Sequence, residues 1–469
     1  MSTTVDPDVI TAPGDAPEPL VEETDRELRT RIFGLAWPMV GETTLHMSME
    51  LVNVALVAAL GTAALAGAGA ALQVMQVMVA ALTALSVGAS ILVSHAIGSG
   101  DRARAGRLAR QALSWSIVLS VPMGVAGWFG APLLVDGFGL TAEATATGTA
   151  YLQVAMGTVV VLVVLLLSTG VLRGAGDSRT PMVVTLAANV VNVVLAWTLI
   201  HGHLGLPEMG VVGAAWATFT SRLLAVVLVL AVLWRGRAVV SIRARSGWRP
   251  RWGVGREILG LGTPAAGEQL LISGAWLAFT VLVAHIGTTE MAVQRVAMTV
   301  LSIVFLPAIG VQLATTALVG QAVGAGRPDV ADRVIRITTR WSLLLVLVIA
   351  GALFVGARPV MGVFSDDPDV VTMGVATLQV MLLTQPFWAV TMQQTGALRG
   401  MRDTVSPLVV EAVVNWTAVA LAAYLIQVVG VGLAQAWVAY VVVGPPLVAL
   451  TVWRRRRRVA HLTARLLPA

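Results

Sequence analysis

Four polar side chains in the first long apolar segment have the types and spacing for cation chemistry. They are Glu42, His46, Glu50 and Asn53, and on a helix they fall within about 80° of one another. Ionisable groups are costly at bilayer depth, so this stripe must face protein or a wet cavity. Burial and mutual repulsion favour protonation of two neighbouring carboxylates, so at least one is expected to exchange a proton near neutral pH. The alternative is that Glu42 only bonds a neighbouring helix and Glu50 lies near a water-filled vestibule.

A second set of side chains has the chemistry for binding an organic cation. Glu268 occupies the position in the second half of the chain that Glu42 occupies in the first, and Trp276 and Phe279 follow it on one helical face. A carboxylate beside an indole attracts a lipophilic cation by charge and by cation–π attraction. We therefore predict substrate contacts at these residues, with ordinary helix packing of the two rings as the alternative. Glu411 and Asn415, four residues apart on one face, are further candidates for a substrate cavity.

Several other kinds of chemistry are disfavoured. The chain has no Cys, and all 31 basic residues are Arg, so neither a thiolate metal site nor the lysine of a nucleotide-binding loop can form. No catalytic triad or metallohydrolase spacing occurs. We expect no enzyme activity, no bound metal and no cofactor other than the coupling ion.

The elements that carry these residues must be membrane-spanning helices. Hydrophobic residues make up 57% of the 469 residues and charged residues only 12%, whereas a soluble domain has about 25% charged residues. The apolar runs reach the roughly 20 residues needed to cross a bilayer. We predict an all-α integral membrane protein of twelve helices, near 34–60, 71–97, 111–134, 148–171, 181–201, 210–234, 257–286, 292–322, 341–364, 371–397, 407–428 and 433–453.

The arginines predict the orientation of these helices. All but three of the 31 lie at the chain ends or in alternate gaps between spans, whereas the other gaps carry acidic residues such as Asp136 and Asp366. Because arginine-rich segments stay in the cytoplasm, both termini are expected there, in the inner (plasma) membrane.

An internal duplication divides the chain into two halves. A shift of 226 residues, from Glu42 to Glu268, also carries Arg173-Gly174 onto Arg399-Gly400. Each half has six spans, so both enter the membrane with the same orientation around a central cavity. The predicted parts are a disordered cytoplasmic tail (1–32, with a short surface helix at 20–31 as the alternative), a six-helix bundle (33–234), an arginine-rich connector (235–256), a second bundle (257–453) and a basic cytoplasmic tail (454–469).

Motifs over nearly all of residues 30–450 resemble the MATE (multidrug and toxic compound extrusion) family in order, spacing and duplication. They include Gly98-Ser-Gly-Asp101, Leu172-Arg173-Gly174-Ala-Gly-Asp177, Gly210-Val-Val-Gly-Ala-Ala-Trp-Ala-Thr218, Val319-Gly320-Gln321-Ala-Val-Gly324-Ala-Gly326 and Leu398-Arg399-Gly400-Met-Arg-Asp403-Thr404. The resemblance implies an antiporter that exports bulky, usually cationic, organic compounds in exchange for Na⁺ or H⁺.

The chain departs from this family at three acidic positions. Asn53 stands where bacterial members often have Asp, Ala196 follows Asn192-Val-Val-Leu195 where many have Asp, and Trp388 replaces an acid in the tenth helix. By this resemblance Asn192 completes a first-half coupling site in which Glu42 and Glu50 replace the missing aspartates. Trp388 joins the predicted substrate-binding residues.

These observations predict a cation-coupled antiporter that exports organic, cationic drugs or toxins by alternating access. H⁺ is favoured over Na⁺ because the missing aspartates leave fewer oxygen ligands. The alternative is a lipid-linked oligosaccharide flippase of the same superfamily, although those proteins usually have more spans and a basic cavity. The expected partners are small organic molecules and the lipid bilayer, without nucleic acid, and the chain is expected to be a monomer. The natural substrate and the direction of transport stay open.

Overall fold

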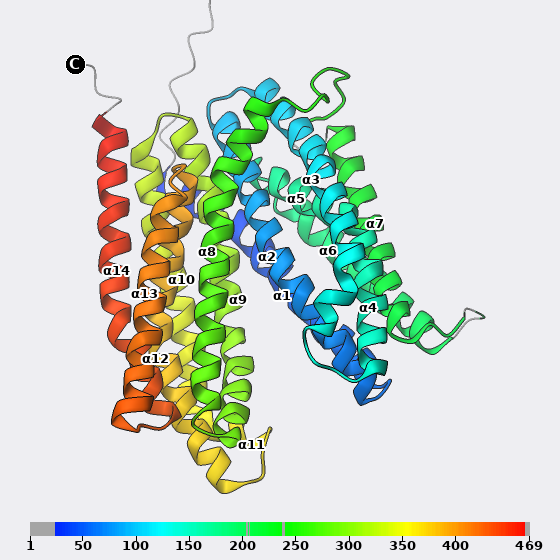
Figure 1. The fold of residues 1–469 in the computed structure, drawn as a ribbon. Helices are drawn as coiled ribbons and strands as arrows, with labels where there is room; N and C mark the ends of the chain where they lie inside the picture. The colour runs from blue at the N-terminus through cyan, green and yellow to red at the C-terminus, as the bar shows by residue number, and fades with distance from the viewer. Residues whose placement is uncertain (1–23, 203–204, 206, 237–239, 465–469) are drawn as a thin grey trace, which may run out of the picture.

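The computed structural model describes residues 24–202, 205, 207–236 and 240–464, which form helices and loops without a β-strand (Figure 1). The helices of the first half are α1 (Asp25–Ala58), α2 (Thr62–Gly98), α3 (Arg102–Asp136), α4 (Ala142–Gly157), α5 (Val159–Gly174), α6 (Arg179–His201) and α7 (Gly210–Arg235). Those of the second half are α8 (Trp252–Ala284), α9 (Thr288–Gly324), α10 (Pro328–Val355), α11 (Ala357–Gly362), α12 (Pro368–Gly400), α13 (Val405–Tyr424) with a π-helical turn (Leu425–Val429), and α14 (Leu433–Ala464).

The predicted all-α membrane architecture is confirmed. Within the described residues, ten helices are long and apolar enough to cross a membrane, and the bent pair α4–α5 makes eleven. The pair bends by 52° at Thr158, where the sequence suggested one straight span. Helix α1 has 34 residues but is more polar, because it carries Glu42, His46 and Glu50. The sequence also predicted a span in α1, which is not among these eleven.

Helices extend beyond the predicted apolar segments at the arginine-rich end. Helix α1 begins at Asp25, where Thr24 and Glu27 form a capping box, so residues 25–32 of the predicted tail are helical. Residues 1–23 lie outside the described part of the chain. Helix α14 continues to Ala464 and includes most of the predicted basic tail. Polar side chains end an apolar run without ending a helix, so these helices are longer than the apolar segments from which they were predicted.

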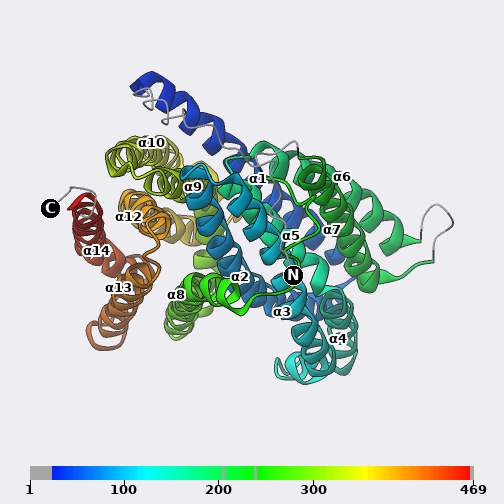
Figure 2. The same cartoon turned by 90° about the horizontal axis from the view of Figure 1, so that it is seen from above.

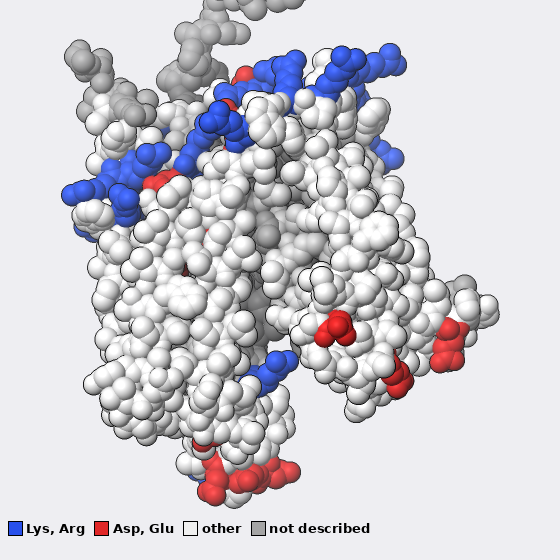
Figure 3. Space-filling model, in the orientation of Figure 1, with Lys and Arg blue, Asp and Glu red and all other residues white. Residues whose placement is uncertain are grey.

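The helices form two groups that lie side by side (Figure 2). The groups meet at the arginine-rich end and separate toward the opposite end, where the exposed acidic residues gather (Figure 3). A cleft runs between the groups and opens toward the acidic end (Figure 3).

Helices α1 and α8 each cross from one bundle to the other. In the first part of α1, Leu28, Ile32 and Met39 pack in a core with α9, α10 and α12 of the second half. The first part of α8 packs on α2 in the reciprocal way, and the carbonyl oxygen of Ile258 would lie 2.7 Å from a Cβ added to Gly88. The predicted bundle boundaries at 33 and 257 therefore do not separate the packing units, because each of these helices belongs to both.

Two hydrogen bonds related by the duplication join the bundles. His95 Nε2 lies 2.8 Å from the carbonyl oxygen of Gly400, and Gln321 Nε2 donates to the carbonyl oxygen of Gly174 over 3.0 Å. The ends of α2 and α9 meet so closely that a Cβ on Gly98 would lie 2.0 Å from the Gln321 carbonyl oxygen. The arginine-rich end is therefore closed by direct helix contact.

The connector between the halves is bound to α3. Gln111 Nε2 donates to the carbonyl oxygens of Gly247 and Arg249 over 2.6 and 2.8 Å, and its Oε1 accepts from the Arg251 amide at 2.8 Å. The connector thus follows the surface of the first bundle before α8 begins.

Candidate functional site

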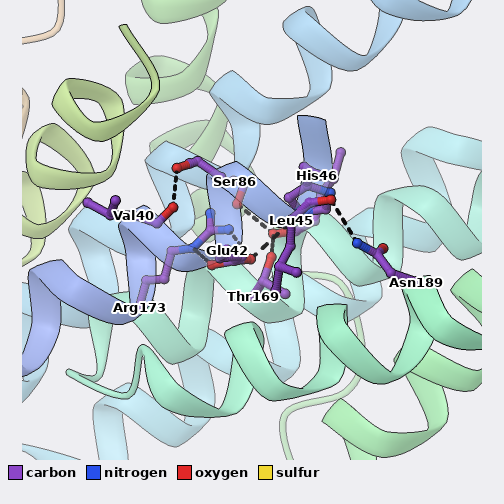
Figure 4. Close-up of polar contacts among 10 residues, drawn as sticks. Val40, Glu42, Leu45, His46, Ser86, Thr169, Arg173 and Asn189 are labelled. Carbon is purple, nitrogen blue, oxygen red and sulfur yellow. Dashed lines mark hydrogen bonds and ion pairs between the residues drawn. The ribbon is translucent and has the colours of Figure 1, made fainter. Parts of the chain in front are cut away.

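The first bundle holds a buried ion pair between Glu42 of α1 and Arg173 of α5 (Figure 4). Arg173 Nη2 donates to Glu42 Oε1 over 2.6 Å and its Nε donates to Oε2 over 3.3 Å, so both carboxylate oxygens are engaged. Glu42 is 1% exposed, and His46 Nε2 lies 3.9 Å from its Oε1. The sequence suggested that Arg173 lies in a cytoplasmic loop, whereas its side chain turns into the bundle and balances the charge of Glu42.

The other three residues of the predicted polar stripe are less buried than Glu42. His46 and Glu50 are exposed, and Asn53 is half-buried with an Oδ1 that has no partner among the described residues. Arg222, midway along α7, interacts electrostatically with Glu50 and with Tyr151 of α4.

The structure does not bring Asn192 to Glu42. The Asn192 side chain is fully buried and donates to Thr218 and Ser221 of α7, over 3.3 Å in each case. Asn189 reaches α1 instead, where its Nδ2 donates to the carbonyl oxygen of Leu45 over 2.7 Å (Figure 4). Residues three apart are offset by about 60° and 4.5 Å along a helix, so here Asn189 contacts α1 and Asn192 contacts α7.

The second bundle contains a related ion pair with an additional carboxylate. Arg399 Nη2 of α12 donates to Glu268 Oε1 of α8 over 2.8 Å. Glu268 Oε2 and Arg399 Nε are buried without a partner among the described residues. Glu411 of α13 is 4% exposed and interacts electrostatically with both Glu268 and Arg399. Asn415 Nδ2 donates to Glu411 Oε2 over 3.2 Å. Glu411 is therefore a second buried carboxylate beside the Glu268–Arg399 ion pair, and it forms no ion pair of its own within the described residues.

The predicted aromatic residues of α8 pack in the second bundle. Phe279 is fully buried, with ring centroids 5.0 Å from Trp437 and 5.4 Å from Tyr440. Phe279 is therefore a core residue, which agrees with the alternative of ordinary helix packing. It lines no cavity among those described. Trp276 is half-buried and stacks on Tyr440 at 5.7 Å with an interplanar angle of 6°.

Two other predicted residues, Trp388 and Asn415, meet at a small cavity inside the second bundle. Its lining is Phe387, Trp388, Val414, Asn415, Ala418, Tyr440, Val443, Gly444 and Leu447. Asn415 also bonds Glu411, so this cavity lies directly beside the pair of carboxylates. The sequence did not indicate Tyr440, whose aromatic character alone does not distinguish a cavity residue from a core residue.

Comparison with known proteins identifies the family. The model of the MatE family matches residues 38–198 and 264–451, which is most of each half. This chain belongs to the MatE family. A protein of Thermotoga maritima, named probable multidrug resistance protein NorM, is 32% identical over 90% of this chain and 91% of its own length. A probable multidrug resistance protein NorM of Bradyrhizobium diazoefficiens is 29% identical over 87% and 88%.

Solved structures share the fold of this MatE protein. One is described as the outward-facing conformation of a multidrug resistance MATE family transporter of the MOP superfamily. The two structures agree with a TM-score of 0.87 over 93% of this chain and 97% of the other, at 22% sequence identity.

The two ion pairs of this MatE protein are counterparts under the duplication. The residues of each pair are separated by 131 positions, and the shift that carries Glu42 to Glu268 also carries Arg173 to Arg399. Because one shift relates both glutamates and both arginines, the sequence does contain a signal that each glutamate pairs with an arginine. It was missed because arginines after an apolar run resemble loop residues.

Proposed function

We propose that this MatE protein exports organic cations from the cell in exchange for protons. The relatives named for multidrug resistance support export, and the cleft between the bundles offers a path for a substrate. The distribution of arginines favours an arginine-rich end in the cytoplasm of a bacterial inner membrane. In that orientation the cleft opens outward. The observation that carries the proposal is the burial of a second carboxylate, Glu411, beside the ion pair of Glu268 with Arg399.

The charges of the two ion pairs favour the second bundle as the proton site. Glu42 and Arg173 sum to zero, whereas Glu268, Glu411 and Arg399 sum to one negative charge if all are ionised. One proton removes that excess, and an uncompensated buried charge is costly. We therefore place the exchangeable proton on the Glu268–Glu411 pair rather than on the first-helix stripe.

The donor groups favour H⁺ over Na⁺. A sodium ion needs several oxygen ligands together, and because Asn53, Ala196 and Trp388 replace acidic residues of the family, fewer carboxylates remain for such a site. A proton needs only one carboxylate oxygen, and Glu268 Oε2 is free of protein partners within the described residues.

Antiport follows if the proton and the substrate compete for the same negative charge. The ionised carboxylate pair would attract a cation that enters beside Asn415. The cavity of Trp388, Asn415 and Tyr440 has a volume of about 10 Å³ in this structure, so it must widen to admit an organic cation. Protonation removes that attraction and lowers the affinity for the cation. This differential binding couples the two fluxes, because each ligand then favours a different state.

Ethidium efflux from vesicles, under separately imposed pH and Na⁺ gradients, tests the coupling ion. We expect the pH gradient alone to drive efflux and the Na⁺ gradient alone to have no effect. Efflux driven only by Na⁺ would contradict the proton mechanism.

Charge-neutralising variants test the location of the site. Glu411→Gln has the same net charge as the protonated pair, so efflux should fall to its level without a gradient and ethidium should bind at high pH as weakly as it binds the protonated wild-type protein. The matched control is the double variant E42Q/R173Q, which removes both charges of the first-bundle pair and should keep pH-driven efflux. The reverse pattern would move the proton site to the first helix.

A further inference from the structure

The second bundle has a helical extension that the first bundle lacks. Helix α7, the counterpart of α14, ends at Arg235 directly after Trp234, because Gly236 adopts a left-handed conformation with φ of 66°. Helix α14 continues after Trp453 through five consecutive arginines, Arg454 to Arg458, and ends at Ala464. The extension therefore places a concentrated positive charge at one edge of the molecule.

One face of this extension is used for packing within the bundle. Arg455 forms an ion pair with Asp332 of α10, and its Nε donates to Gln394 Oε1 of α12 over 3.1 Å. Arg458 Nη2 donates to the carbonyl oxygen of Met401 over 3.4 Å. These two arginines attach the extension to its neighbours and are not available to a ligand.

The other face carries arginines that form no ion pair within the described residues. The guanidinium carbons of Arg457 and Arg454 lie 4.1 and 5.8 Å from the ring centroid of Trp453, which is 43% exposed. Both arginines are exposed, as is Arg456. Both guanidinium groups lie within about 6 Å of one indole ring, where cation–π attraction holds them.

The position of these arginines along α14 places them next to a lipid-facing apolar surface. Val442 and Leu450 are exposed apolar residues on the same side of α14, and they lead directly to Trp453. Tryptophan is typical of the membrane–water interface, where a lipid-facing apolar surface ends. Arg454 and Arg457 therefore lie at the level of the phospholipid headgroups.

We propose that Trp453, Arg454 and Arg457 bind the headgroup phosphate of an anionic phospholipid in the leaflet at the arginine-rich end. Guanidinium groups match phosphate oxygens in pairs of parallel hydrogen bonds. The acyl chains of the bound lipid lie along Val442 and Leu450, a surface that a soluble phosphate would not use. Arg456 adds attraction toward a negative membrane surface. This inference is independent of the transported substrate and of the coupling ion.

Native mass spectrometry of the full-length protein, delipidated in detergent, tests the proposal. Phosphatidylglycerol, phosphatidylcholine and inorganic phosphate are titrated separately. The wild-type protein should bind phosphatidylglycerol in preference to phosphatidylcholine, and excess inorganic phosphate should not displace it. The variant R454Q/R457Q should bind phosphatidylglycerol roughly 10- to 30-fold more weakly, at about one kcal/mol for each arginine.

Two further variants serve as controls. Arg235→Gln removes an arginine that follows a tryptophan at the end of α7, and it should leave the affinity unchanged. R454K/R457K keeps both charges without the planar groups and should give an intermediate affinity. Equal binding by the wild-type protein and R454Q/R457Q, an equal loss in R235Q, or displacement by phosphate would each overturn the proposal.

Discussion

Corresponding residues in the two halves make different contacts, and the buried ion pairs show the consequence. Glu42 meets Arg173 through both oxygens, whereas the ion pair of Glu268 with Arg399 has a second buried carboxylate, Glu411, beside it. The charges of the first pair are balanced. The second has one surplus carboxylate, which makes its proton exchangeable in our proposal.

This contrast predicts different stabilities for two equivalent variants. Glu42→Gln leaves the Arg173 charge buried without a counterion, so the free energy of unfolding should fall by about 3 kcal/mol. Glu268→Gln should cost only about 1 kcal/mol, because Glu411 still balances Arg399. Denaturant unfolding in detergent micelles measures both, and equal losses would show that Glu411 does not compensate.

A second residue-scale prediction concerns the turn after each ion-pair arginine. Gly176 has φ of 89°, and its counterpart Arg402 has φ of 61°, the only positive value among the described non-glycine residues. A left-handed conformation costs a residue with a Cβ about 1 kcal/mol. Arg402→Gly should therefore raise the free energy of unfolding by about 0.5 kcal/mol, after loss of the exposed contact with Glu257. Gly176→Arg should lower it, and the opposite signs would contradict this explanation.

At the scale of elements, the halves are joined by helices that cross between them and by the close approach of α2 and α9. Helix α1 packs its first part on the second bundle, and α8 packs its first part on the first bundle. Glycines permit the contact of α2 with α9 at the arginine-rich end. A tilt of one bundle against the other must therefore separate this contact and bend or slide α1 and α8.

Adding one methyl group at the contact between α2 and α9 should open it. A Cβ on Gly98 would lie 2.0 Å from the Gln321 carbonyl oxygen, and one on Gly324 would lie 2.4 Å from that of His95. Gly98→Ala and Gly324→Ala should each lengthen the distance between spin labels on cysteines introduced at Arg104 and Asp329. Gly260→Ala in α8 is the control, because nothing lies within 4 Å of its added Cβ. Unchanged distances in both glycine variants would mean that the helices adjust without opening.

At the scale of the whole molecule, charge is divided between the two ends. Arginines gather at the end where the bundles meet, and exposed acidic residues gather at the open end (Figure 3). The open end therefore faces the outside if the arginines stay in the cytoplasm.

Labelling of single cysteines in intact cells tests this orientation. The chain has no native cysteine, so each introduced thiol is unique. A membrane-impermeant maleimide should label Asp366→Cys directly, whereas Arg104→Cys should react only after the membrane is permeabilised. Both positions are exposed, so accessibility within the protein does not explain a difference. Labelling of Arg104→Cys alone would reverse the proposed orientation.

Sequence alone determined the membrane-spanning helical class and the duplication, because the lengths of the apolar runs and the spacing of the repeat are properties of the sequence itself. It also singled out Glu42 as a cation-coupling residue and Glu268, Glu411 and Asn415 as substrate-binding residues, and all four are buried in the structure. Only the tertiary structure decided that Arg173 and Arg399 pair with two of them, that Asn192 turns to α7 and that Phe279 is core. The rotation and tilt of each helix decide these contacts, and packing against neighbours sets both.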